Sequence, residues 1–290
     1  MKCTLCPRSC GAERDGKTGA GFCRMPAGLR VARAALHHWE EPPISGKNGA
    51  GTVFFSGCTL RCCYCQNGDI SAGGQGRDIT PERLREIYFE LLGQGAHNIE
   101  LVTPTHFLPW ILPSLEPKLP VPVVYNCGGY EKVETLRLLE GKVDVWLPDL
   151  KYSDGALARE LSGAEDYFPV ACDAIREMFR QTGRPIHDGN GLMRRGVIVR
   201  HLVLPGYLDN TRRVLDWLAE TFAPGDVAVS LMSQYTPPPH MTGRLARRVT
   251  AAEYRAAVAY MRNCGIEDGF VQERTSAEEA YTPAFDGTGV

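Results

Sequence analysis

The chain has 290 residues, of which 43% are hydrophobic and 23% are charged, and its 32 basic and 34 acidic side chains leave a formal net charge of -2. This composition is that of an ordinary globular protein, and the near-neutral charge argues against a nucleic-acid partner. No run approaches 18 apolar residues and no apolar segment follows Lys2. We therefore expect a cytoplasmic protein with no membrane-spanning helix and no membrane partner.

The predicted elements begin late in the chain. Residues 1–50 are rich in glycine, cysteine and charge and contain no long periodic segment, and the two prolines within Glu40–Gly46 predict an extended or turning backbone there. From Gly51 onward, short apolar runs alternate with helical patterns. We predict strands at 51–56, 98–103, 121–125, 143–147, 196–204 and 226–232, and a seventh at 269–272.

Helical patterns separate these strands. Thr80 is a predicted N-cap followed by Pro81, and Thr250 with Glu253 forms a predicted capping box. We predict helices at 81–92, 133–139, 156–161, 174–181, 211–220 and 251 to about 263. Apolar strands that are each followed by a helix predict an α/β fold with a parallel sheet, either a β/α barrel or a doubly wound open sheet.

Polar residues follow each of the six predicted strands. Because the functional side chains of a parallel barrel lie beyond the carboxyl ends of its strands, we expect these residues to form one site. In chain order they are Ser56 and Cys58; Thr103, Thr105 and His106; Asn126 and Cys127; Asp149 and Lys151; Arg200 and His201; and Ser233, Gln234 and Tyr235.

Three of these residues have a structural alternative. His106 either orients a ligand or is a satisfied capping histidine. If Arg200 faces the barrel lumen, His201 faces the other side of the strand and packs in the core. Cys127 is a buried structural thiol by default and a weak candidate for a catalytic hydrogen-atom donor, because it lies at the expected site.

The 11 cysteines form an unusual pattern for a chain without an export signal, and they indicate metal ligands or redox groups. Cys58, Cys62 and Cys65 form a Cys-x3-Cys-x2-Cys sequence after the first predicted strand. Three thiolates from one loop can hold three irons of a [4Fe–4S] cluster and leave the fourth iron open. The alternatives are a zinc site, a Cys62–Cys65 redox dithiol and inert buried thiols.

A second cysteine group lies at the N-terminus. Cys3, Cys6, Cys10 and Cys23 supply four thiols within 21 residues. They can close a zinc site, hold a second iron–sulfur cluster or form a metal-free redox segment, and their spacing does not decide between these.

The cysteine loop, with Tyr64 just before its last cysteine, resembles the signature loop of the radical S-adenosylmethionine (SAM) superfamily. The strings Glu41–Gly46, Phe54–Cys58 and Cys65-Gln66-Asn67 are similar to those of the PflX group, relatives of pyruvate formate-lyase activating enzymes. So are Pro104-Thr105-His106, Tyr125-Asn126 with Gly129-Tyr130, and Asp149–Tyr152. The resemblance covers roughly residues 3–240.

The resemblance implies a role for several residues. Cys58, Cys62 and Cys65 would ligate the [4Fe–4S] cluster, and Tyr64 would lie near the adenine of SAM. The sequence Thr103-Pro104-Thr105 replaces the Gly-Gly-Glu that usually holds the SAM amino group, so Thr105 or backbone carbonyls would take that role. The full set of expected cofactor-binding residues is Tyr64, Thr103, Thr105, His106, Asn126, Asp149, Lys151, Arg200 and Gln234.

The resemblance also implies a fold and a reaction. We expect a partial (β/α)6 barrel of the radical SAM type at 48–240, a Cys-rich extension at 1–47, and a C-terminal helix, last strand and tail at 241–290. The reaction would be reductive cleavage of SAM and hydrogen abstraction from a protein or peptide, such as activation of a glycyl radical enzyme, with a flavodoxin or ferredoxin as electron donor. The alternatives are a small-metabolite substrate and a zinc-binding or dithiol redox module that cleaves no SAM.

Overall fold

The computed structural model describes residues 2–16, 19–267, 269–271 and 283–290. Its strands form one sheet in the order β10-β9-β8-β6-β5-β4-β2-β1-β3, with β7 paired to β8. Neighbours from β2 to β10 along this path are parallel. These strands are β2 (Ala50–Phe55), β4 (Ile99–Val102), β5 (Val123–Cys127), β6 (Val145–Pro148), β8 (Met193–Leu202), β9 (Ala228–Met232) and β10 (Gly269–Val271). The parallel α/β architecture and the six main strands are confirmed, with ends that shift by up to three residues. The seventh also forms, although Gln272 lies outside the described residues.

Three strands were not predicted: β1 (Leu29–His37), β3 (Arg77–Ile79) and β7 (Ile186–His187). Strand β1 runs antiparallel to β2, with Val31 opposite Phe55 and His37 opposite Ala50. The expectation that residues 1–50 contain no long element is therefore wrong. The signal was weak because β1 is rich in alanine and arginine, and pairing with β2 and β3 compensates for its low strand propensity.

The main helices connect the parallel strands. They are α3 (Pro81–Gly93), α4 (Leu108–Ser114), α5 (Val133–Arg137), α6 (Gly155–Ser162), α7 (Tyr167–Thr182), α8 (Leu208–Thr221) and α9 (Ala251–Asn263). Both predicted N-termini are confirmed: the Thr80 side chain accepts from the Arg83 N–H, and the capping box of Thr250 and Glu253 is complete. Short turns of helix form at α2 (Gly68–Ser71), η1 (Thr105–Phe107) and η2 (Gly243–Ala246).

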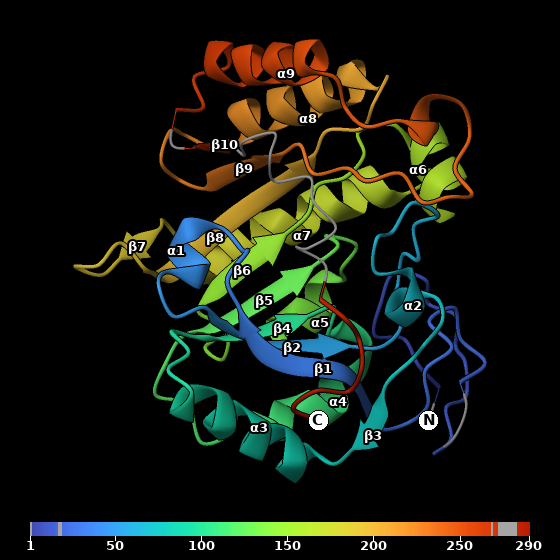
Figure 1. The fold of residues 1–290 in the computed structure, drawn as a ribbon, viewed down its shortest axis with the longest axis vertical. Coiled ribbons are helices and arrows are strands. Elements are labelled where there is room, and N and C mark those ends of the chain that lie inside the picture. Colours follow the sequence, from blue (N-terminus) through green and yellow to red (C-terminus); the bar gives the residue numbers. More distant parts are fainter. Residues whose placement is uncertain (1, 17–18, 268, 272–282) are drawn as a thin grey trace.

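The Pro-Pro stretch forms one helical turn, α1 (Pro42–Ser45), which is the turning rather than the extended alternative of the prediction. A proline is tolerated there because the first turn of a helix needs no N–H donor. Ile44 of α1 is fully buried, and the Asn98 side chain donates to its carbonyl. The residues clustered with Ile44 are Ala50, Val124, Val145, Leu147, Met193, Ile198 and Ala228. Helix α1 therefore closes the end of the barrel at which the strands begin, and Figure 1 shows it at the opposite end of the sheet from α2.

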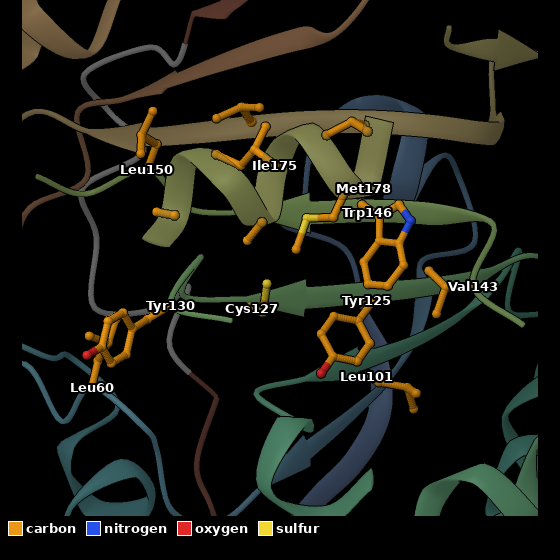
Figure 2. Close-up of a cluster of buried hydrophobic side chains, with 14 of the residues drawn as sticks. Leu60, Leu101, Tyr125, Cys127, Tyr130, Val143, Trp146, Leu150, Ile175 and Met178 are labelled. Atoms are coloured by element: carbon orange, nitrogen blue, oxygen red, sulfur yellow. The ribbon is translucent and has the colours of Figure 1, made fainter. Parts of the chain in front are cut away.

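The larger core lies between the sheet and its helices. Figure 2 shows Ile175 and Met178 of α7 beside Trp146 of β6 and Tyr125 of β5, all of them in one buried cluster. The rings of Tyr125 and Trp146 have centroids 5.1 Å apart. This packing fixes the strands whose carboxyl ends carry the predicted site. No helix among the described residues is long and apolar enough to cross a membrane.

Candidate functional site

A cavity of about 230 Å³ lies at the carboxyl ends of the parallel strands. It is the place where the structure gathers most of the predicted site residues. Those that line it are Cys58, Cys62, Tyr64, Cys65, Thr103, Asn126, Cys127, Asp149, Lys151, Arg200 and Gln234. Side chains that are up to 176 positions apart in the sequence therefore face one space.

The cysteine loop leaves β2 and supplies three thiols to this cavity. The Cys65 N–H donates to the Cys62 carbonyl at 3.1 Å, and the Ser162 hydroxyl donates to the Cys62 sulfur at 3.0 Å. Burial, with the neighbouring Cys62, raises the pKa of Cys58 to about 12 and also raises the pKa of Cys65. Bare thiolates at Cys58 and Cys65 are thus disfavoured here, and a cationic metal centre would reverse that penalty. The loop therefore fits a [4Fe–4S] cluster with three protein ligands.

Tyr64 is buried beside the thiols. The Tyr152 hydroxyl donates to its hydroxyl at 2.8 Å, and the ring centroid of Tyr235 lies 6.0 Å from its own. These contacts fix an aromatic face at the cavity wall.

Arg200 connects three of the strand ends. Its Nε donates to Asp149 at 2.9 Å, its Nη1 to Glu40 at 2.8 Å and its Nη2 to Asn126 at 2.6 Å. Asp149 also accepts from the Lys151 ammonium at 2.5 Å. Burial alone would raise the pKa of Asp149, but Arg200 and Lys151 hold it below its ordinary value. Arg200 and Lys151 are therefore charged groups fixed in place beside the thiols.

Two of the expected cofactor-binding residues do not line the cavity. The Thr105 hydroxyl is buried and donates to Glu131 at 2.9 Å. The Nε2 of His106 lies 2.7 Å from the Ser56 carbonyl, and burial lowers the pKa of His106 to about 4. Helix η1 turns both side chains into the core, which favours the structural alternative for His106. Thr103 remains at the cavity with φ 57°, a left-handed conformation that is rare for a β-branched residue and typical of functional sites.

The predicted alternation at the end of β8 is confirmed. Arg200 faces the cavity, and His201 is fully buried on the other side. The Nδ1 of His201 lies 2.6 Å from the Leu150 carbonyl and its Nε2 lies 3.0 Å from the Thr211 hydroxyl. His201 is a core residue.

Sequence analysis missed three carboxyl groups. Glu40 and Glu41 line the cavity, and Glu100 lies fully buried in β4, where it accepts from Thr52 at 2.7 Å and from Asn126 at 2.8 Å. Burial raises the pKa of Glu40 to about 8 and also raises the pKa of Glu100. The sequence signal for Glu100 was a carboxylate inside an otherwise apolar strand, Ile99–Val102.

The N-terminal cysteines lie apart from this cavity. Cys3 and Cys6 are buried, Cys23 is partly buried and Cys10 is exposed. Burial raises the pKa of Cys6 to about 12, and the nearby thiols of Cys23 and Cys3 add to this effect. Across residues 2–16, 19–267, 269–271 and 283–290, no three His, Cys, Asp or Glu side chains are arranged to hold a single metal ion.

The N-terminal segment is bonded to the cysteine loop. The Arg8 guanidinium donates to the carbonyls of Thr59 at 2.9 Å and Ser162 at 2.6 Å. It also stacks on Phe22, 3.8 Å from the ring centroid. Arg61 of the loop donates back to the Phe22 carbonyl at 3.1 Å. The two cysteine groups therefore belong to adjoining segments.

Comparison with known proteins gives one relative in sequence. No family model matches the chain. An uncharacterized protein of Methanocaldococcus jannaschii, MJ0674, is 30% identical over an alignment of 246 residues that covers 81% of this chain and 66% of that protein. The chain thus spans slightly less than two thirds of that relative.

Solved structures resemble the chain in fold. SuiB of Streptococcus suis bound to S-adenosylmethionine has a TM-score of 0.52 and 13% identity, with 79% of this chain and 52% of SuiB covered. Methylornithine synthase, PylB, has a TM-score of 0.52 and 16% identity, with 83% and 65% covered. The hydrogenase maturase HydG of Carboxydothermus hydrogenoformans has a TM-score of 0.51 and 13% identity, with 80% and 55% covered.

These three neighbours are radical SAM enzymes. At such low identity the likeness concerns the fold, and the chain spans about half the length of SuiB. The chain has the α/β fold of radical SAM enzymes, which confirms the predicted fold class.

Proposed function

We propose that the protein is a radical SAM iron–sulfur enzyme in which Cys58, Cys62 and Cys65 hold a [4Fe–4S] cluster. One observation carries the proposal: three thiols of a Cys-x3-Cys-x2-Cys loop face the same cavity as the polar side chains at the carboxyl ends of the neighbouring strands. A fold shared with radical SAM enzymes supports it. Neither a zinc site nor a dithiol needs the polar side chains at the ends of five further strands.

The cluster, when bound, supplies one electron for cleavage of SAM to methionine and a 5′-deoxyadenosyl radical. The chain's own residues bind and orient SAM. Lys151 and Arg200 are held by Asp149 and offer N–H donors to the polar groups of SAM. Tyr64 gives an aromatic face for the adenine. The buried walls of the cavity keep water from a reactive radical.

For the substrate, we place hydrogen abstraction from a protein or peptide first, including activation of a glycyl radical enzyme. The resemblance to activating enzymes supports this choice, and SuiB has been solved with its precursor peptide SuiA. A flavodoxin or ferredoxin would donate the electron. The rival substrate is a small metabolite.

The four N-terminal thiols form our second proposed metal site. The proximity of the thiols of Cys3, Cys6 and Cys23 supports it, and both zinc and an iron–sulfur cluster suit thiolate ligands. Counting iron and zinc in a Cys3→Ala/Cys6→Ala variant distinguishes the two metals. An unchanged metal count would reject the second site.

The central test is anaerobic reconstitution with iron and sulfide, followed by SAM binding and a dithionite-driven assay for 5′-deoxyadenosine. We expect product from the wild type and from Cys172→Ala, a matched control that removes a buried thiol from α7. Cys58→Ala should give no product and should lose the iron–sulfur absorption. A wild type that binds no SAM would reject the proposal and leave the zinc or dithiol module.

A further inference from the structure

The inner part of the cavity is rich in carboxyl groups. Glu40, Glu41 and Asp149 line it, and Glu100 lies directly behind Asn126. The cationic side chains that line it are Arg200 and Lys151. Burial raises the pKa of Glu40 and Glu100 and so favours their neutral forms. Among the described residues, the carboxyl groups of Asp149 and Glu41 therefore remain to be matched with donors.

Arg200 and Lys151 are already engaged. Arg200 bonds Glu40, Asp149 and Asn126, and Lys151 bonds Asp149. His37 is 3.9 Å from Glu40, but burial lowers the pKa of His37, which disfavours its cationic form. The groups around Glu40 and Glu100 therefore satisfy one another. Arg200 is close enough to Glu41 for their charges to attract, but none of the hydrogen bonds named here reaches Glu41.

Glu41 is the carboxylate that remains unsatisfied. It is 6% exposed, it lines the cavity, and its Oε2 has no hydrogen-bond partner among the residues that the structure describes. A buried, unpaired carboxylate oxygen costs free energy, so its retention points to a ligand that supplies the missing donor.

The position of Glu41 separates it from the cysteine loop. Glu41 immediately precedes α1, which packs where the parallel strands begin, whereas the loop follows the last residue of β2. Figure 1 shows α1 and the α2 region that follows the loop at opposite ends of the sheet. A ligand that reaches Glu41 must extend from the thiols into the barrel, as a substrate placed beyond SAM would.

We infer that the substrate carries a cationic group, an alkylammonium or a guanidinium, which binds the Glu41 carboxylate inside the barrel. That the bound molecule is a substrate rests on the proposed function, whereas the cation site itself rests on the residues that line the cavity. A free amine and a lysine or arginine side chain of a peptide share this chemistry.

The test is a titration of the full chain with matched probes, read by isothermal calorimetry. The small probes are the Nα-acetyl amides of lysine and arginine beside those of norleucine and citrulline, so that only the side chain differs in charge. The peptide probes are Gly-Lys-Gly and Gly-Arg-Gly beside Gly-norleucine-Gly. We expect a cationic probe to bind at least about tenfold more tightly than its neutral counterpart. Tighter binding of the cationic probe among the small probes alone identifies a free small molecule as the source of the cation. Tighter binding among the peptides alone identifies a peptide side chain.

Glu41→Gln keeps the shape of the side chain and removes its charge. We expect it to reduce the preference for the cation about tenfold, while Glu86→Gln on the exposed face of α3 leaves it unchanged. The unfolding temperature of Glu41→Gln should stay the same or rise, because an unpaired charge is removed. A purely structural Glu41 would instead give a lower unfolding temperature and the wild-type preference for cations.

Two results overturn the inference. Equal binding of charged and neutral probes would show that the cavity selects no cation. A Glu41→Gln variant that weakens SAM binding as much as it weakens probe binding would assign Glu41 to the SAM amino group. These titrations need no reduced cluster, so their failure is distinct from a wild type that gives no 5′-deoxyadenosine.

Discussion

Glu131 is a buried carboxyl group, and no ion pair in the described part of the chain includes it. It is 2% exposed, its Oε1 accepts from Thr105, and the Cys127 thiol lies within hydrogen-bonding reach of its carboxyl group. Burial raises its pKa to about 8, far above the value of about 4.3 that it has in an unfolded chain. The folded protein therefore keeps this proton over a range of pH in which the unfolded chain releases it.

The expected consequence is a loss of stability as the pH rises. Between about pH 4.3 and pH 8 the folded state binds one more proton at Glu131, so the free energy of unfolding falls by up to about 1.4 kcal/mol per pH unit. Glu131→Gln copies the neutral acid and should remove this part of the slope. Urea unfolding of both proteins at pH 5, 6, 7 and 8 measures it, and parallel curves would contradict the prediction.

Single residues also show how far the sequence informs the site. Strand ends and cysteine spacing are local features, so Cys58, Asp149 and Lys151 were found to face one cavity as expected. Thr105 was misplaced because the turn of η1 after β4 leaves no mark in the strand pattern. Glu40 and Glu41 were missed because their place depends on α1 folding back into the barrel, which is a tertiary event.

At the scale of elements, α1 is a short helix whose Ile44 side chain is fully buried in the core cluster at the start of the strands. Truncation of the Ile44 side chain to alanine leaves a cavity among the seven buried residues that cluster with it. Ile44→Ala should therefore lower the free energy of unfolding by about 2–4 kcal/mol. Ile186→Ala is the matched control, since Ile186 is 54% exposed and should cost less than about 0.5 kcal/mol. Equal urea midpoints for the two variants would mean that α1 does not close the barrel.

Elements were predictable where their signals were local. Thr80-Pro81 and the capping box at Thr250 identify two helix starts because caps act within one turn. Helix α4 was missed because it contains Pro109 and Pro113, which argue against a helix, although the first of them lies in the first turn where proline is tolerated. Strand β1 depends on pairing with β2, and no residue pattern within it indicates that pairing.

At the scale of the whole molecule, the N-terminal segment and the barrel meet through a few polar contacts. Arg8 donates to carbonyls of the cysteine loop and of the end of α6, among them Thr59, Ser162 and Gly163. Its guanidinium also stacks on the ring of Phe22, and the Phe22 carbonyl accepts from Arg61 of the cysteine loop. Because the loop has no helix or strand of its own, its shape depends on these contacts.

Arg8→Ala should therefore loosen both cysteine segments together. The variant leaves several carbonyls without their donor, which should lower the free energy of unfolding by about 1–3 kcal/mol. Hydrogen exchange should rise about tenfold or more in residues 2–16 and in the loop 57–65, and should stay unchanged in the buried strands β5 and β6. Arg83→Ala, which breaks only exposed ion pairs on α3, should change neither segment. Faster exchange in residues 2–16 alone would show that the loop keeps its shape unaided, so that the N-terminal segment is attached to the loop without supporting it.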